Sequence, residues 1–372
     1  SARPSSGAQS MVRGNTISYG TGVLPDRDYP ADPYPGTVPD CSFVHLDELS
    51  HPVYADWSAP AGWRVRTVDP AGTDLDDWLA GHGGEPMAAR IPVLTYGSNR
   101  CPSKITWLRH GLGLAGPVVV LRVTTRDVAA VWAAGLRLRD GQRPAVLAAV
   151  PGAVEDHALW LATADQLEVL DRCEGRDDRY RLARPRIIVR TENGGLIERP
   201  WCYLALAPIR QPLLVGADGA PVRCLAVAQA QARDLGGRPA TDDGLDAETE
   251  HGAPSPDQWP AMLFGYGLLQ PGRAGWPLVA PHVDGSPRPA TALGTVHDTG
   301  LGWPAMLLDR PGAGGRGEVA GTVIPLREPG TLLPVLDRYE GPDYRRVRLT
   351  LTDGTLAWAY VWVGDRAILR PP

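Results

Sequence analysis

The pattern Leu-Asp-Arg-x-Glu-Gly occurs twice in the chain, as Leu170-Asp171-Arg172-Cys173-Glu174-Gly175 and as Leu336-Asp337-Arg338-Tyr339-Glu340-Gly341. An apolar run that ends in Tyr-Gly precedes each copy, namely Val93-Leu94-Thr95-Tyr96-Gly97 and Met262-Leu263-Phe264-Gly265-Tyr266-Gly267. The separation from tyrosine to glutamate is nearly equal, from residue 96 to 174 and from 266 to 340.

The same order continues after each hexapeptide. A tyrosine follows each glutamate, Tyr180 in one copy and Tyr344 in the other, and each copy closes on an aromatic-rich segment, residues 201–204 and 358–361. Because order and spacing agree over a long stretch, chance is a poor explanation, and the pattern predicts a tandem duplication of one domain.

Composition excludes several classes of protein. The 372 residues suffice for about two or three domains, and 43% hydrophobic with 21% charged residues is typical of a globular protein. The net charge of −5 provides no basic footprint, so neither nucleic acid nor an anionic membrane is expected as a partner. No apolar run is long enough to span a bilayer. Residues 1–15 lack the apolar core of a signal peptide, so we expect a cytoplasmic protein.

No metal site or disulfide framework is expected. The five cysteines are scattered without C-x-x-C spacing. A group of His45, Asp47, Glu48 and His51 fits no standard ligand pattern and is interpreted as a solvated turn. Lys104 is the only lysine among many arginines, a bias typical of a GC-rich bacterial genome.

The chain divides into four predicted parts. Residues 1–90 form a Pro- and Gly-rich, partly irregular extension with a short helix near residues 73–80, and we expect it to drape over the following domains. Residues 91–237 form the first domain and residues 258–372 the second. Between them, residues 238–257 read as an acidic linker.

Many short strands with few helices predict an α+β fold. In the first domain, strands are expected up to residue 96 and at residues 118–124, 145–150, 158–161, 187–189 and 201–206. Helices are expected from residue 102 or 103 to 109, from a capping box at Thr163 and Gln166 to a C-terminal glycine at Gly175, and at residues 222–235. The second domain repeats the progression with a helix near residues 331–339.

These motifs together resemble the gamma-glutamylcyclotransferase-like family. The first copy, with Tyr96-Gly97-Ser98-Asn99, is similar to the glutathione-pathway branch; the second, with Tyr266-Gly267-Leu268-Leu269, is similar to the shorter AIG2-like and gamma-glutamylamine branch. The resemblance covers about residues 91–237 and 259–370. It implies two tandem mixed β-barrels with flanking helices, each with a pocket at one mouth that the Tyr-Gly loop and the glutamate face.

The resemblance also implies a reaction, the cyclisation of a γ-glutamyl amide to 5-oxoproline with release of a free amine. One buried carboxylate could first take the proton of the α-ammonium and then give it to the leaving amine. Glu174 and Glu340 are the candidate catalytic residues, and no cofactor is required. The candidate substrate-binding residues are Tyr96, Gly97, Ser98, Asn99, Tyr180, Tyr203, Tyr266, Gly267, Leu268, Leu269, Tyr344 and Tyr360.

Less specific interpretations stand beside this one. A glutamate before a helix-ending glycine is commonly a solvated residue, and the tyrosines could serve packing alone. Ser98, Cys101 and Cys173 lack a histidine in a recognisable relation, which argues against a nucleophile. His110 and His157 are more often surface or core residues.

Three functions remain compatible with the sequence. They are a cyclotransferase for a γ-glutamyl amine or peptide, an acyl-transfer or amide-trimming enzyme of secondary metabolism, and a non-catalytic module that binds a small molecule or a protein. The glutamate in both copies favours an enzyme. The oligomeric state stays open; a duplicated chain could act as a monomer that forms an internal pseudo-dimer.

Overall fold

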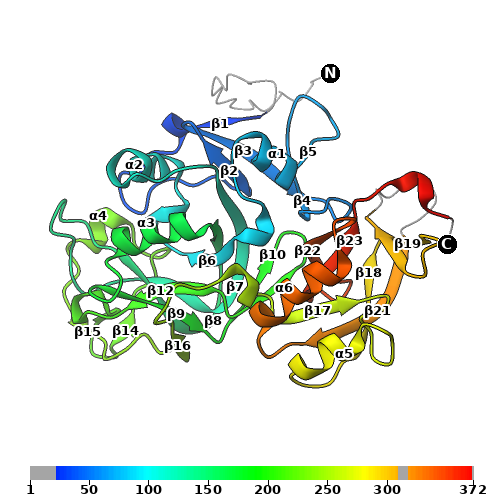
Figure 1. Cartoon of the computed structure of the whole chain (residues 1–372). Coiled ribbons are helices and arrows are strands. Elements are labelled where there is room, and N and C mark those ends of the chain that lie inside the picture. Colours follow the sequence, from blue (N-terminus) through cyan, green and yellow to red (C-terminus); the bar gives the residue numbers. More distant parts are fainter. Residues whose placement is uncertain (1–21, 309–316, 371–372) are drawn as a thin grey trace, which may run out of the picture.

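The computed structural model describes residues 22–308 and 317–370, which form a mixed α+β structure with several sheets and few helices (Figure 1). Residues 1–21, the start of the predicted extension, lie outside the described residues. Within the described part, no helix is long and apolar enough to cross a membrane.

A large sheet organises residues 22–261, which we call the first half. Its strand order is β16-β9-β12-β6-β8-β7-β2-β3-β4-β5. The bounds are β2 Phe43–Leu46, β3 Leu49–Ala55, β4 Trp63–Val65, β5 Thr73–Asp74, β6 Ile91–Thr95, β7 Val118–Trp132, β8 Ala145–Ala162, β9 Tyr180–Pro185, β12 Trp201–Ala205 and β16 Ala247–Thr249. Three short strands lie off this path, β1 Leu24–Pro25, β10 Ile188–Thr191 and β11 Leu196–Glu198. The path begins at β16 and ends at β5, so the described residues form no closed barrel, in contrast to the barrel that the resemblance implied.

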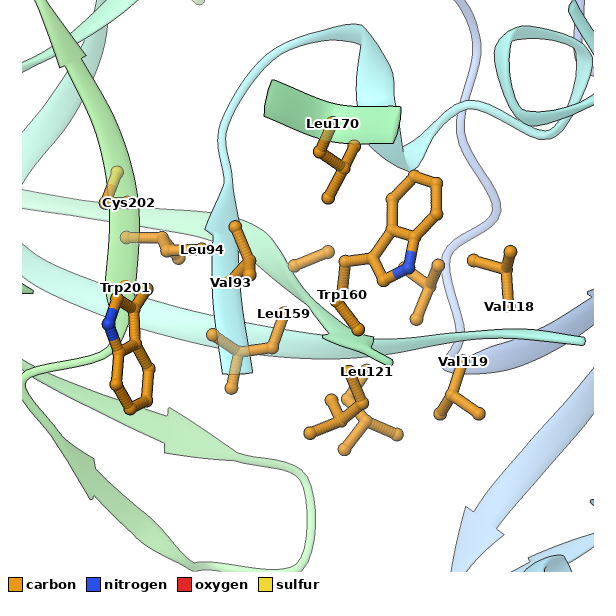
Figure 2. Packing of buried hydrophobic residues seen from close by; sticks show 14 of the residues in the cluster. Val93, Leu94, Val118, Val119, Leu121, Leu159, Trp160, Leu170, Trp201 and Cys202 are labelled. Atoms are coloured by element: carbon orange, nitrogen blue, oxygen red, sulfur yellow. The ribbon is translucent and has the colours of Figure 1, made fainter. Parts of the chain in front are cut away.

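The strands around β6 surround the main core. Val93 and Leu94 of β6, Leu159 and Trp160 of β8 and Trp201 of β12 are all buried (Figure 2). All five residues of β6 are buried, so burial does not alternate along this strand. Both faces of the sheet are therefore covered at β6.

Strands β7 and β8 form one long antiparallel hairpin. The prediction of separate strands at residues 145–150 and 158–161 was wrong in this respect, because β8 continues through both. Gly152, with φ of 81°, lies between the two predicted segments. Strand β8 pairs with β7 at residues 145–149 and again at residues 154–161, and the irregularity between Arg126 and Val128 of β7 leaves residues 150–153 without a partner in that strand.

Helix α3 (Ala164–Glu174) begins and ends where the sequence predicts. The Thr163 hydroxyl accepts a hydrogen bond from the Gln166 amide, and Gly175 ends the helix with φ of 69°. The predicted capping box is only half formed, because the Gln166 side chain binds Trp160 and the carbonyls of Ala115 and Pro117 instead. Helix α2 (Pro102–Leu112) has Pro102 at its first turn, as expected.

The segment before β6 extends the first sheet. Strand β2 pairs antiparallel with β7, and β3, β4 and β5 follow it outward. Helix α1 (Leu75–Gly81) begins at the predicted place, with Asp74 accepting hydrogen bonds from the amides of Asp76 and Asp77. The solvated-turn interpretation was wrong for His45, which is completely buried in β2 and binds Asp26. His51 lies in β3 and is half-buried.

The predicted helix at residues 222–235 is largely absent, and α4 (Gln229–Ala232) is a single turn. Residues 222–224 instead lie along β7, where Trp132 donates to the Val222 carbonyl and Cys224 donates to the Ala130 carbonyl. Tertiary pairing therefore overrides the local preference for helix. A small sheet is formed nearby by β13 (Leu213–Val215), β14 (Ala220–Pro221) and β15 (Arg238–Pro239).

The segment predicted as an acidic linker, residues 238–257, contributes to both sheets of the first half. It contains β15 and β16, and β16 pairs antiparallel with β9 at the edge of the large sheet.

A second sheet of order β18-β21-β17-β23-β22 organises the residues from 262 onward, which we call the second half. This part is drawn yellow to red in Figure 1. Its strands are β17 Met262–Gly265, β18 Arg288–Leu293, β21 Glu318–Pro325, β22 Tyr344–Thr350 and β23 Leu356–Trp362. Helices α5 (Trp276–Val279) and α6 (Pro329–Glu340) and a hairpin of β19 (Thr295–Asp298) and β20 (Pro304–Leu307) accompany it.

The two central strands have the same kinds of neighbour. Strand β6 pairs antiparallel with β8 and parallel with β12, and β17 pairs antiparallel with β21 and parallel with β23. Trp201 lies opposite Val93 in the first sheet, and Trp358 lies opposite Leu263 in the second. The sequence correspondence is therefore repeated in strand pairing.

Arginines of β22 join the second sheet to the N-terminal segment. The buried Arg348 guanidinium lies between the rings of Trp259 and Trp358 and donates to the carbonyls of Met87 and Ala88. Arg345 forms an ion pair of 2.6 Å with Asp76, whose side chain is only 6% exposed. Arg345 of β22 therefore neutralises the buried carboxylate of Asp76 in α1, where the second sheet contacts the N-terminal segment.

We expect Arg345→Ala to lower the free energy of unfolding by about 1–3 kcal/mol, because Asp76 would remain buried without its charged partner. Urea unfolding measures this change. Arg327→Ala is the matched control, since Arg327 and its partner Asp284 are both largely exposed and 3.9 Å apart, and its effect should stay within about 0.5 kcal/mol. Equal effects of the two variants would show that the contact between the halves does not depend on this pair.

Candidate functional site

One chain of hydrogen bonds fixes the Tyr-Gly loop of the first half. The Tyr96 hydroxyl donates to the Tyr203 carbonyl at 2.6 Å, and the Tyr203 hydroxyl donates to the Asp171 carboxylate at 2.6 Å. Because β6 and β12 are parallel, their carboxyl ends meet at one edge of the sheet, and the bond to Asp171 ties helix α3 to the same edge. Glu174, the last residue of α3, consequently lies beside the loop.

The second half repeats these bonds with its own residues. The Tyr266 hydroxyl donates to the Tyr360 carbonyl at 2.7 Å, and the Tyr360 hydroxyl donates to Asp337 of α6 at 2.7 Å. Glu340 is the last residue of α6, as Glu174 is of α3. The two candidate carboxylates therefore occupy corresponding positions.

The first pocket is a cavity of about 730 Å³ next to the first Tyr-Gly loop. Seven of its lining residues were predicted from sequence: Tyr96, Gly97, Ser98, Asn99, Glu174, Tyr180 and Tyr203. The cavity is large enough for a substrate with a substantial group beyond the reacting amide.

Glu174 has a specific hydrogen-bond donor. The Asn99 side-chain amide donates to Glu174 Oε1 at 2.6 Å. Burial raises the pKa of Glu174, and this bond and the positive charges of Lys104 and Arg179 oppose the rise. Asn99 Oδ1 is buried and accepts no hydrogen bond within the described structure, so it is available to a donor in the pocket.

The N-terminal segment contributes a wall of the first pocket. Tyr34 is buried and lines the cavity, and its hydroxyl accepts a hydrogen bond from the Ala145 amide. A side chain on Gly97 would approach the Tyr34 hydroxyl to 2.5 Å, so glycine is required for this close contact.

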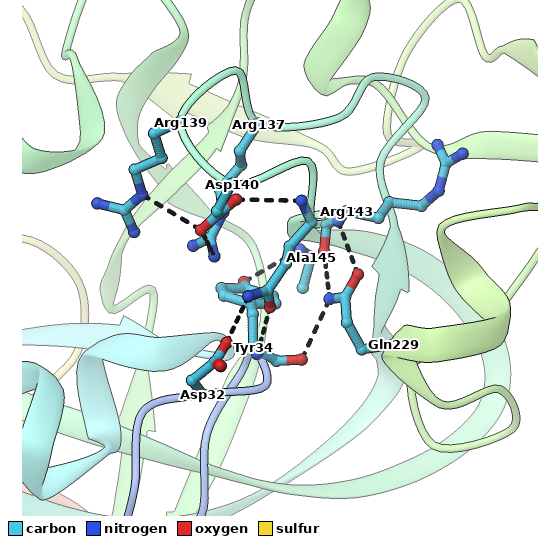
Figure 3. Close-up of polar contacts among 9 residues, drawn as sticks. Asp32, Tyr34, Arg137, Arg139, Asp140, Arg143, Ala145 and Gln229 are labelled. Atoms are coloured by element: carbon cyan, nitrogen blue, oxygen red, sulfur yellow. Dashed lines mark hydrogen bonds and ion pairs between the residues drawn. The ribbon is translucent and has the colours of Figure 1, made fainter.

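A polar network holds Tyr34 in place (Figure 3). Its backbone amide donates to Gln142 Oε1 and its carbonyl accepts from Gln229, while the Arg137 guanidinium lies 4.6 Å from the centre of its ring. Gln142 also donates to Asp32. Residues from the N-terminal segment, the β7–β8 connection and α4 thus meet at this wall.

The first pocket is rich in basic side chains. Five line it, and they are Lys104, Arg137, Arg139, Arg179 and Arg210, against the two acidic side chains of Glu174 and Asp178. Arg137 pairs with Asp140, and Arg179 donates to the carbonyls of Cys173 and Glu174.

The second pocket is smaller, about 200 Å³, and much less polar. Its predicted lining residues are Tyr266, Gly267, Leu268, Leu269, Glu340, Tyr344 and Tyr360, and Trp303, Pro304 and Tyr339 join them. Glu340 is the one acidic side chain among its lining residues, which include no basic side chain. Burial raises the pKa of Glu340 to about 7.

The environments of the two carboxylates differ at one aligned position. Leu269 stands in the second loop where Asn99 stands in the first, and leucine cannot donate a hydrogen bond. In the described residues the Glu340 carboxylate has no hydrogen-bond donor, and burial is the cause of its raised pKa. A carboxyl with a pKa near neutrality can both accept and donate a proton at neutral pH.

A different segment closes the second pocket. A side chain on Gly267 would approach Pro304 of β20 to 2.7 Å, and the Tyr344 hydroxyl donates to the Pro304 carbonyl. The β19–β20 hairpin thus occupies the position beside the loop that Tyr34 occupies in the first half.

Every candidate residue from the sequence lines one of the two pockets, seven in each. Sequence reasoning missed Tyr34, Lys104, Arg210, Trp303 and Pro304. Lys104 had a signal of its own, since it is the only lysine of the chain. The others lie in segments whose position depends on tertiary packing.

Other candidate chemistry is not favoured. Cys173 lines the first pocket, but burial raises the pKa of its thiol, which disfavours the reactive thiolate. Cys101 is buried against the carbonyl of Tyr29. Among the described residues no cluster of His, Cys, Asp and Glu could hold a metal ion.

The model of the family "Gamma-glutamyl cyclotransferase, AIG2-like" matches residues 263–371, a range that includes Tyr266 and Glu340. The mixed α+β architecture is consistent with such a fold. No curated protein matches the chain.

Two solved structures show a limited likeness. An uncharacterized protein, loc79017, from Homo sapiens is 17% identical with a TM-score of 0.27, and the match covers 32% of this chain and 68% of that one. YkqA from Bacillus subtilis is 13% identical with a TM-score of 0.25, and the match covers 47% of this chain and 61% of that one.

Proposed function

We propose that the chain converts γ-glutamyl amides into 5-oxoproline and a free amine, with Glu340 and Glu174 as the proton-transferring groups of two pockets. The observation that carries this proposal is one half-buried carboxylate with a raised pKa beside a Tyr-Gly loop, present in both halves. The family match supports cyclotransferase-like chemistry for the second half.

We also propose that residues 91–237 and 258–372 are tandem copies of one domain. The equivalent strand neighbours of β6 and β17 and the repeated tyrosine bonds support this duplication. The copies have since diverged around their carboxylates, as Asn99 and Leu269 exemplify.

The proposed reaction needs a folded-back substrate. The carboxylate takes a proton from the substrate's α-ammonium, and the freed amine attacks the γ-carbonyl carbon. A new C–N bond closes the five-membered ring, and the carboxyl gives its proton to the leaving nitrogen as the bond to that nitrogen breaks. The regenerated carboxylate then takes the second proton from the ring nitrogen and passes it to the released amine, which leaves as an ammonium. Because the nucleophile is tethered to its target, holding the folded-back conformation supplies much of the rate enhancement.

The side chains around Glu174 fit these steps. Asn99 holds the Glu174 carboxylate by one hydrogen bond, and its unpartnered Oδ1 can accept a hydrogen bond from the α-ammonium. Tyr34 and Tyr96 restrict the space beside the loop, which favours a compact substrate conformation. In the second pocket, Trp303 and Tyr344 supply comparable apolar walls.

The raised pKa of Glu340 has a consequence for stability. A carboxyl whose pKa is raised on folding stabilises the fold fully below its unfolded value of 4.5, and this contribution is lost as the pH rises through about 7. We therefore expect Glu340→Gln to melt at a higher temperature than the wild type at pH 8, with little difference at pH 4, as measured by calorimetry.

The control for this prediction is Glu318→Gln, an exposed glutamate of β21, which should melt like the wild type at both values of pH. A second variant, Leu269→Asn, should reduce the effect of pH, since a donor to the ionised carboxylate lowers its pKa. A difference between Glu340→Gln and wild type that is the same at pH 4 and pH 8 would contradict a raised pKa.

Replacing glutamate by glutamine keeps the shape of the side chain and removes the base. We expect Glu340→Gln and Glu174→Gln each to lower kcat for the substrate of its own pocket by roughly 10²–10⁴-fold, with a smaller effect on KM. Release of 5-oxoproline from a panel of γ-glutamyl amines measures the rates of wild type, both single variants and the double variant.

Full activity of the double variant toward a substrate that the wild type turns over would refute the carboxylate mechanism. Glu318→Gln again serves as the control and should keep the wild-type rate. If only Glu340→Gln reduces the rate, the second pocket alone carries the activity.

A further inference from the structure

The hydroxyl of Tyr34 is a hydrogen-bond donor that the chain leaves unused. Tyr34 is 7% exposed and lines the first pocket. Its hydroxyl oxygen accepts a hydrogen bond of 3.0 Å from the Ala145 amide (Figure 3). A phenol also carries one proton to donate, and within residues 22–308 and 317–370 that proton goes to no protein acceptor. The first pocket therefore presents a free donor to the molecule that it encloses.

Tyr34 keeps its proton at neutral pH. Burial raises the pKa of its hydroxyl, against the hydrogen bond from Ala145, and the charge of Glu174 acts in the same direction as burial. The polar network around Tyr34 also holds the ring in place before any ligand binds. A donor that is fixed in advance and stays protonated has the properties that stabilisation of an oxyanion requires.

The Tyr34 hydroxyl lies against the first Tyr-Gly loop. A Cβ atom on Gly97 would approach the hydroxyl oxygen to 2.5 Å and the ring carbon Cζ only to 3.5 Å. Glu174 is bound to the same loop, through the Asn99 amide at 2.6 Å. The free donor and the carboxylate that transfers the proton are therefore placed beside one short loop.

In the part of the chain that the structure describes, the second pocket has no hydroxyl at this position. Pro304 of β20 lies beside Gly267 instead, and its carbonyl accepts the hydrogen bond of Tyr344. Tyr34 belongs to the N-terminal segment, which precedes both copies of the repeated pattern. The hydroxyl therefore reaches one of the two sites from outside the proposed duplication.

We propose that Tyr34 is a catalytic residue of the first pocket and donates a hydrogen bond to the γ-carbonyl oxygen of the substrate. As the α-amine attacks, one electron pair of the C=O bond moves to the oxygen, and the hydroxyl stabilises this negative charge. The pair re-forms the carbonyl when the bond to the leaving nitrogen breaks, and Tyr34 keeps its proton throughout. This inference rests on the proposed function for the reaction.

The close contact with the loop is tested first, without ligand. Gly97→Ala places a methyl group within 2.5 Å of the Tyr34 hydroxyl oxygen, whereas after Tyr34→Phe the nearest atom is Cζ at 3.5 Å, an ordinary contact. We expect Gly97→Ala to lower the melting temperature of the wild type clearly and that of Tyr34→Phe much less. Additive effects would mean that the hydroxyl does not lie on the loop, and would overturn the proposal.

A labelled ligand then tests the hydrogen bond. γ-Glutamylmethylamide with an isotope label at its γ-carbonyl is bound to the full chain carrying Glu174→Gln and Glu340→Gln, which should not consume it. Because a hydrogen bond to a carbonyl oxygen lowers its infrared stretching frequency, we expect a low-frequency band that moves to higher frequency after Tyr34→Phe. The band of ligand in the second pocket should not move.

Tyr54→Phe is the matched control. Tyr54 lies in β3 of the same segment, its hydroxyl donates to the Ala71 carbonyl at 3.0 Å, and it is absent from the linings of both pockets. Each replacement removes one hydroxyl with its hydrogen bond to the backbone, so both should lower the melting temperature. A structural role alone would therefore leave the carbonyl band of the ligand in place, and Tyr54→Phe should do so.

Turnover is read in the Glu340→Gln chain, in which the first pocket is intact. Tyr34→Phe should lower kcat for release of 5-oxoproline from the same compound by roughly 10²–10³-fold with little change in KM, and Tyr54→Phe should leave both constants unchanged.

Three further results would overturn the proposal: a carbonyl frequency that does not depend on the Tyr34 hydroxyl, no binding of the amide, or an unchanged kcat in Tyr34→Phe. The failure of the proposed function gives a different result. In that case no chain releases 5-oxoproline, while the band still moves with Tyr34→Phe, and Tyr34 remains the residue that binds the carbonyl.

Discussion

In each half, a tyrosine hydroxyl at the end of one strand donates a hydrogen bond to a backbone carbonyl of the parallel strand beside it. This interaction determines where each pocket lies. In the first half, β6 and β12 end at one edge because they run in the same direction, and the bond from Tyr96 to the Tyr203 carbonyl joins their ends. The second bond, from Tyr203 to Asp171, brings in α3. Glu174 is placed three residues later along the same helix, so its position beside the loop is a consequence of backbone geometry.

The two halves share this arrangement of strands and tyrosine hydrogen bonds and differ in the residues around it. The pattern Leu-Asp-Arg-x-Glu-Gly keeps the aspartate that fixes the helix and the glutamate that faces the pocket, while the loop changes from Asn99 to Leu269. A hydrogen-bond donor and nearby cations therefore oppose the rise that burial causes in the pKa of Glu174, whereas burial alone sets the pKa of Glu340. Since burial favours the neutral acid and donors favour the ion, the same residue type is given two different proton affinities.

The positions of the motif residues could be predicted from sequence because local geometry fixes them. Thr163, Gly175 and the spacing between them specify α3 and hence the place of Glu174. The walls could not be predicted in this way. Tyr34 reaches the first pocket through contacts with Gln142 and Gln229, residues far away in sequence, and nothing local indicates those partners.

The same argument explains why the helix expected at residues 222–235 did not form. It also explains why the basic residues lining the first pocket were not predicted. Residues 222–224 pair with β7, and that extended path lies close to α4, whose Gln229 binds both Tyr34 and Arg143. Local propensity for helix is weak compared with such pairing. In the first half, the N-terminal segment and residues 207–210 enclose the larger cavity. In the second half, the β19–β20 hairpin closes the smaller pocket. Because the enclosing segments are unrelated, the pockets can differ in size and charge while their carboxylates keep one position. Two pockets built on equivalent strands can therefore differ in what they enclose while the position of the carboxylate stays the same.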